Sequence, residues 1–148
     1  MGRLIVFEHN TCVDAGLGWG HGQRPDPNGR HLMFYDNSAA TTKVVIRNNI
    51  FCNATDSLLR LHGRDWTAAL VMDRNCWYQP DGAWLLWGQQ TIGARGFAAF
   101  MHARGLDANS LATDPQFVNP AQRNYHLRPV SPARTLSADG KFAGALPD

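Results

Sequence analysis

The residues best suited to chemistry lie in one loop rich in glycine and proline, at residues 17–30. His21 offers a base, Asp26 a carboxylate and Arg24 a guanidinium group. A base that removes a proton beside a substrate carboxylate, with an arginine that binds this carboxylate, is the chemistry of a uronate lyase. Irregular loops on a rigid scaffold often carry function, although loop hydrogen bonding alone also accounts for these residues. The candidate catalytic residues are therefore His21, Arg24 and Asp26.

A second candidate site is an aromatic surface on the strands that follow this loop. Alignment of three apolar segments predicts one outward column made of Tyr35, His62 and Trp87. Arg60 lies beside this column. Aromatic rings stack on the C–H faces of sugars, but the same column can simply strengthen a sheet. The candidate substrate-binding residues are Trp19, Arg30, Tyr35, Arg60, His62 and Trp87.

The elements that must position these residues are marked by an asparagine that recurs in one frame. Asn10, Asn49 and Asn75 each follow a valine by four positions and a charged residue by two. The intervals of 39 and 26 residues indicate a repeat, the longer one with an insertion. Asparagine tolerates the left-handed conformation at a sharp corner, and stacked amides hydrogen-bond between repeats. We therefore assign Asn10, Asn49 and Asn75 to a structural ladder rather than to catalysis.

Two strands per repeat are predicted, one before each asparagine and one after a turn. Period-two alternation points Ile46 and its equivalents inward. It also places Glu8, Arg47 and Asp73 in one outward column of alternating charge. The second strands are expected at residues 31–36, 58–63 and 83–88. Short strands repeated at one register predict a parallel β-solenoid.

The chain divides into repeats and a closing segment within a single domain. Residues 1–93 are predicted to form the coils, with an inserted loop at residues 15–30. Residues 94–148 are predicted to form a C-terminal helix and capping segment, with Phe97 on the apolar face of the helix. A cap is needed because an open solenoid end exposes the core and unpaired strand edges.

The repeated frame at residues 44–51 and the ending at residues 114–120 resemble right-handed parallel β-helix proteins of the pectate-lyase-like superfamily. The resemblance implies an all-β fold, a short right-handed parallel β-helix of about three coils with a short α-helix and an irregular C-terminal cap. The chain looks like the C-terminal coils and cap of a longer member. The resemblance also implies a polysaccharide groove along one sheet and, in some members, a Ca²⁺ ion. The superfamily includes lyases, hydrolases and binding proteins, so it does not choose among these functions.

Composition and charge narrow the classes of partner. The 148 residues carry a net charge of +2 and 44% hydrophobic residues. This balance predicts a folded domain with neither nucleic acid nor membrane as its partner. The three cysteines have no metal-ligand spacing, so free thiols and no metal site are expected, and no cofactor is predicted. No signal peptide is visible in this chain, and the cellular location is undefined, although longer relatives of the resembled family are often secreted.

Three functions are compatible with the sequence. The first is a carbohydrate-related protein that binds an acidic polysaccharide along one sheet face; as an enzyme it would be a lyase rather than a glycoside hydrolase, because no carboxylate pair stands out. The second is a binding module without catalysis. The third is a structural fragment that forms a homodimer through its exposed N-terminal coil, since residues 5–7 have no preceding coil to pair with.

Overall fold

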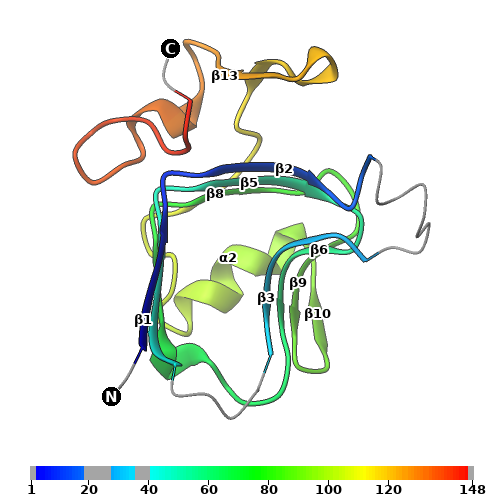
Figure 1. Cartoon of the computed structure of the whole chain (residues 1–148), viewed down its shortest axis with the longest axis vertical. Helices are drawn as coiled ribbons and strands as arrows, with labels where there is room; N and C mark the ends of the chain where they lie inside the picture. Colours follow the sequence, from blue (N-terminus) through cyan, green and yellow to red (C-terminus); the bar gives the residue numbers. More distant parts are fainter. Residues whose placement is uncertain (1–2, 19–27, 36–40, 147–148) are drawn as a thin grey trace.

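The strands of the described residues form four β-sheets, and three of these sheets are built mainly from parallel strands (Figure 1). The computed structural model describes residues 3–18, 28–35 and 41–146. Sheet A contains β1 (Arg3–Glu8), β4 (Thr41–Arg47) and β7 (Leu70–Asp73). Sheet B contains β2 (Thr11–Ala15), β5 (Ile50–Ala54), β8 (Cys76–Tyr78) and β11 (Leu111–Ala112). Sheet C contains β3 (Arg30–Phe34), β6 (Ser57–Leu61), β9 (Ala83–Trp87) and β10 (Gln90–Ile92).

Each repeat contributes one strand to each of these three sheets, and successive repeats pair in parallel register. Glu8 is aligned with Arg47 and Arg47 with Asp73, so the predicted outward column is present in sheet A. Arg47 Nε donates to Glu8 Oε2 at 2.6 Å. In sheet B, Cys12 is aligned with Phe51 and Phe51 with Trp77. Equivalent residues of neighbouring repeats therefore contact one another across strands about 4.8 Å apart.

The prediction of a short right-handed parallel β-helix, with two strands in each coil, is wrong. Within the described residues the strands form four separate sheets and no closed solenoid. Strand β10 pairs antiparallel with β9, and sheet D is an antiparallel pair of β12 (Phe117–Asn119) and β13 (Asn124–Leu127). Each repeat also has an additional strand between the two predicted strands. It begins directly after the asparagine, in a stretch that the sequence alignment assigned to a turn. The structure therefore consists of separate sheets, two of which contain antiparallel strand pairs, and not of one continuous parallel coil.

The core lies between sheets A, B and C. Phe7, Phe51 and Trp77 stack in sequence, with ring centroids 6.1 Å and 4.3 Å apart. Leu59 and Leu85 close the core from sheet C and are fully buried. Burial of each such side chain contributes about 1.5–3 kcal/mol, so this column of large rings and leucines is a main source of stability.

Asn10, Asn49 and Asn75 lie one above another where sheet A turns into sheet B. The Oδ1 atom of Asn49 accepts from the backbone N and the Nδ2 of Asn10, at 2.9 and 3.1 Å. The Oδ1 atom of Asn75 accepts from the same two groups of Asn49, both at 3.1 Å. Asn49 Nδ2 also donates to the carbonyl oxygens of Phe7 and Arg47. Because Asn49 and Asn75 are 0% exposed, these bonds replace the water that the corner excludes.

The left-handed corner residue is the one before each asparagine, not the asparagine itself. His9, Asn48 and Arg74 have φ angles of 55°, 58° and 55°. The expectation that the ladder asparagines would take this conformation is therefore wrong. The preceding residue turns the backbone, and this leaves the asparagine side chain directed along the stack.

The ladder ends on two residues that are not asparagine. The backbone N of Asn75 donates to Ser110 Oγ at 2.9 Å, and Asn75 Nδ2 donates to Asp107 Oδ1 at 3.0 Å. Burial raises the pKa of the Asp107 carboxyl to about 6, against the lowering effect of donors on Ser110, Asn75 and Trp77. The Trp77 indole nitrogen and Asp107 Oδ2 are both buried, and neither has a hydrogen-bond partner among the described residues. Asp107 is thus a buried acid at the closed end of the ladder.

Helix α2 (Ala94–His102) covers the end of the core beyond the third repeat (Figure 1). The Phe97 ring lies 5.6 Å from that of Trp77 and 5.4 Å from that of Trp84. The later C-terminal segment does not cover this end; it packs on the outer face of sheet B, where Phe117 and Leu127 join Ile50 in a second buried cluster. The short 3₁₀ helices are η1 (Thr67–Ala69), η2 (Pro120–Gln122) and η3 (Pro132–Thr135).

Replacement of the central ladder residue tests the role of the asparagines. We expect Asn49→Ala to lower the free energy of unfolding by about 3 kcal/mol, because buried donors and acceptors lose their partners. Asn10→Ala, at the solvent-facing end of the same ladder, is the matched control and should cost about 1 kcal/mol or less. Urea unfolding followed by circular dichroism measures both, and equal losses would contradict the buried-ladder explanation.

The buried Asp107 carboxyl makes stability depend on pH. The pKa of this carboxyl is about 6 in the folded state, against an ordinary value of 3.8. The contribution of Asp107 to the free energy of unfolding is therefore complete below about pH 4 and is lost as pH rises through about 6. Asp107→Asn keeps an acceptor oxygen but does not ionise. Between pH 4 and 8 its stability should therefore rise by about 3 kcal/mol relative to the wild type. Burial lowers the pKa of His31, but this group titrates in both proteins, so the difference curve isolates Asp107; a flat difference curve would refute the assignment.

Candidate functional site

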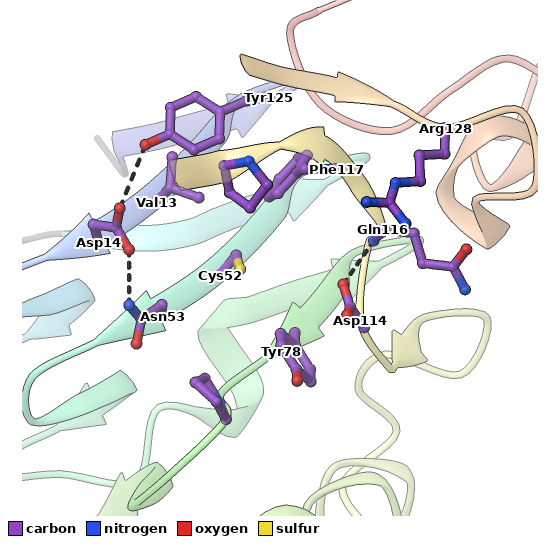
Figure 2. Close-up of a pocket in the computed structure, with 12 residues that line it drawn as sticks. Val13, Asp14, Cys52, Asn53, Tyr78, Asp114, Gln116, Phe117, Tyr125 and Arg128 are labelled. Carbon is purple, nitrogen blue, oxygen red and sulfur yellow. Dashed lines mark hydrogen bonds between the residues drawn. The ribbon is translucent and has the colours of Figure 1, made fainter. Parts of the chain in front are cut away.

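A groove of about 300 Å³ lies between the outer face of sheet B and the C-terminal segment (Figure 2). Strands β2, β5 and β8 form its floor, and the chain around β12 and β13 forms its wall. Apolar, amide, phenol and charged side chains all contribute to its surface. The lining residues are Val13, Asp14, Cys52, Asn53, Tyr78, Pro80, Asp114, Gln116, Phe117, Pro120, Tyr125 and Arg128.

The floor of the groove is a single column of the repeat. Val13 is aligned with Cys52, and Cys52 with Tyr78. These side chains face outward because their neighbours in the strands, such as Phe51 and Trp77, point into the core. The three repeats therefore place a valine, a thiol and a phenol in a line along the groove.

One end of the groove is a polar corner that joins the first repeat to the C-terminal segment. Asp14 and Asn53 have positive φ angles of 56° and 60°, and Asn53 Nδ2 donates to Asp14 Oδ1 at 2.7 Å. The Tyr125 hydroxyl donates to the other carboxylate oxygen of Asp14 at 3.4 Å (Figure 2). Both oxygens of Asp14 are thus oriented by neighbours, and the carboxylate is held at the mouth of the groove.

The opposite end carries the second carboxylate of the groove. Asp114 Oδ1 accepts from the backbone N of Gln116 at 2.7 Å (Figure 2). Arg128 Nη2 donates to the Val118 carbonyl at 3.3 Å. The Phe117 ring packs edge-on against Tyr125, with centroids 5.4 Å apart. Asp114 and Asp14 therefore lie at the two ends of one partly apolar groove, as Figure 2 shows.

The charged residues that line the groove are Asp14, Asp114 and Arg128, so carboxylates outnumber guanidinium groups there. Burial raises the pKa of the Cys52 thiol to about 12, and the charges of Asp114 and Asp14 raise it further. Burial also raises the pKa of Tyr78, with Asp114 adding to the effect, and the pKa of Tyr125, with Asp14 adding. A ligand that is neutral and rich in hydroxyl groups avoids the repulsion that an anion would meet here.

The predicted arginines of sheet C share one carboxylate. Arg30 Nε lies 2.6 Å from Asp56 Oδ2, and Arg60 Nη1 lies 3.5 Å from the same atom. Among the described residues of this face, two guanidinium groups share one carboxylate. Arg30, predicted to lie in the inserted loop, is the first residue of β3, and it meets Arg60 of β6 through Asp56.

The predicted aromatic column is only partly assembled. Tyr35 and His62 stack with ring centroids 5.4 Å apart and an interplanar angle of 2°, and Tyr35 is 58% exposed. Trp87 is aligned with Leu61 rather than with His62, so its place in the column was wrong by one residue. It packs instead against Phe100, at 5.6 Å.

The physical reason for this error is the composition of β9, Ala-Trp-Leu-Leu-Trp. Its large residues are apolar on both faces, so no alternation of polar and apolar residues sets the register. A slip of one residue sends every side chain to the other face. Leu85 stands two residues before Trp87, so the predicted register also directed it outward, whereas it is fully buried.

The predicted catalytic loop cannot be placed. Trp19, His21, Arg24 and Asp26 lie outside the described residues, and their role stays a prediction. In the described ranges, no group of three or more His, Cys, Asp or Glu side chains could hold a metal ion, so these residues do not fit the Ca²⁺ site that the family resemblance implies. Nor does that part of the chain contain a helix long and apolar enough to cross a membrane.

The sequence reasoning missed the groove, although the repeat frame contained a signal for it. Asp14 and Asn53 each stand four positions after a ladder asparagine, and Tyr78 stands three positions after Asn75. A column of outward residues on a third strand was thus readable once that strand was recognised. The contribution of Tyr125 was not, because only the fold brings it to Asp14.

Comparison with known proteins finds no match to any family model, curated protein or solved structure. Nothing beyond the chain's own residues therefore links it to the pectate-lyase-like superfamily.

The raised pKa of Cys52 predicts an unreactive thiol even though it lines a groove. At pH 8 a thiol with a pKa of about 12 is ionised only to about one part in ten thousand, and the thiolate is the reactive form. We expect iodoacetamide to modify Cys52 at least about a hundredfold more slowly in the folded protein than in urea. Peptide mass spectrometry over time measures this rate, and rapid labelling of the folded protein would contradict the burial of Cys52 and the raised pKa of its thiol.

Proposed function

We propose that this protein binds carbohydrate, and that the groove on sheet B holds a neutral sugar chain. The observation that supports this most directly is the placement of Tyr78 between two carboxylates, Asp14 and Asp114, in one groove. A tyrosine ring offers an apolar face to the C–H side of a sugar, while carboxylates accept hydrogen bonds from its hydroxyl groups. The proposal is one of binding, and it includes no reaction.

The size and polarity of the groove agree with such a ligand. Its volume of about 300 Å³ suits one or two sugar rings, and it is lined by apolar side chains with a few polar groups between them. Asn53 and Gln116 add amides that can both donate and accept. Asp14 is already oriented by Asn53 and Tyr125, so little ordering is needed when a hydroxyl group binds.

A second proposal concerns the outer face of sheet C, where an acidic polysaccharide was expected from the sequence. The exposed Tyr35–His62 stack offers a flat surface, and among the described residues beside it Arg30 and Arg60 share the carboxylate of Asp56. Positive charge and an aromatic face together favour a uronate over a neutral sugar. The two sites thus differ in the charge of the ligand that they favour.

Calorimetry with neutral and uronate oligosaccharides tests both proposals with one pair of variants. We expect neutral oligosaccharides to bind the wild type and to lose about tenfold in affinity in Tyr78→Ala, because the stacking face is removed. Tyr35→Ala is the matched control: it removes a tyrosine from sheet C and should leave neutral binding unchanged. Uronate binding should show the reverse pattern.

Each proposal is contradicted by a different binding result. Neutral binding that is equally strong in Tyr78→Ala would remove the groove as the site. Uronates that bind more tightly than neutral sugars and depend on Tyr78 would contradict the electrostatic argument. If neither class of ligand binds up to millimolar concentration, the carbohydrate proposal fails.

A further inference from the structure

The first repeat leaves three strand edges open at one end of the molecule. Strands β1 and β3 are the outermost strands of sheets A and C, and β2 is the outermost strand of sheet B on the same end. On their outer side these strands pair with no strand of the described ranges. Leu4, Ile5 and Val6 of β1 are 62%, 48% and 49% exposed. An exposed apolar edge strand without charges in its middle is a template for pairing with another chain.

The same end opens onto the core. A hollow of about 330 Å³ is lined by Ile5, Phe7, Leu32, Met33, Phe34, Tyr35, Val44, Ile46 and Trp66. Most of these side chains are apolar and belong to the first two repeats. The open end therefore combines free backbone hydrogen-bonding groups with an apolar surface, which is the composition of an interface.

The opposite end is more fully covered by the described residues. Strand β8 is paired with β11 and β9 with β10, and the backbone N of Asp107 donates to the Met72 carbonyl of β7. Helix α2 lies over the core at that end, with Phe97 and Met101 buried. Within the described residues, the first-repeat end is therefore the one where free strand edges adjoin an apolar hollow that opens onto the core.

We propose that a second copy of this chain covers the open end, with the two β1 strands paired antiparallel about a two-fold axis. Strand β1 has Arg3 at its start and Glu8 at its end, with uncharged residues between them. Antiparallel pairing brings the Arg3 end of each strand to the Glu8 end of the other, whereas parallel pairing brings like charges together. Because a two-fold axis uses the same surface of both copies, this contact closes at two chains and does not grow into a fibre.

The oligomeric state of two matched variants tests this interface. Val6 and Val71 lie in the same column of sheet A and are similarly exposed, at 49% and 45%, but Val71 is on β7 at the closed end. We expect the wild type to be a dimer at about 100 µM, a concentration that fills a micromolar interface. Val6→Lys should be a monomer, because it places a charge at the paired edge, and Val71→Lys should remain a dimer. Light scattering after gel filtration measures the masses.

A second variant and a second measurement keep the test decisive if Val6→Lys does not fold. Arg3→Glu, at an exposed end of β1, should weaken the dimer about two- to fivefold through lost charge pairing. Hydrogen exchange of the β1 amides should slow as protein concentration rises. A wild-type monomer at about 100 µM, or equal effects of Val6→Lys and Val71→Lys, would overturn the proposal. A monomer whose β1 amides are protected only when another polypeptide is added would assign the open end to a different partner and refute self-association.

Discussion

The structure depends on how the buried corner between sheets A and B satisfies its backbone. At this corner the chain changes direction in every repeat, and the backbone N–H groups of Asn10 and Asn49 bond to side chains rather than to backbone carbonyls. Asn49 supplies the missing donors to the Phe7 and Arg47 carbonyls and accepts from Asn10. Without this exchange, each turn would bury unpaired polar groups at a cost of about 1–3 kcal/mol apiece.

The same corner sets the chemistry of the outer surface. In each repeat the strand of sheet B starts directly after the ladder asparagine. The position of the asparagine therefore sets which side chains of that strand point inward and which point outward. Phe51 and Trp77 go to the core, and Cys52 and Tyr78 go to the groove. The C-terminal segment then covers this outer face, and Tyr125 completes the corner at Asp14. The groove is therefore a product of the ladder register and of one long-range docking contact.

The strands differ in how well their position and register could be predicted from the sequence. The sheet A strands and their charge column were predictable, because Ile46 and Arg47 alternate between faces as a half-buried strand requires. The strands of sheet B were missed, since both of their faces are covered and the alternation of polarity disappears. Strand β9 was misaligned for a similar reason, because a tryptophan or leucine fits either face.

By itself, the sequence determined the repeat, the ladder asparagines and the inward and outward faces of sheet A, because these are local properties of spacing and polarity. Tertiary structure decided the division into separate sheets, the register of Trp87 and the meeting of Asp14 with Tyr125. It also decided that Asp107 is buried, which raises the pKa of its carboxyl to about 6. These features depend on contacts between residues far apart in the chain, and neither spacing nor polarity along the sequence encodes which of the compatible contacts forms.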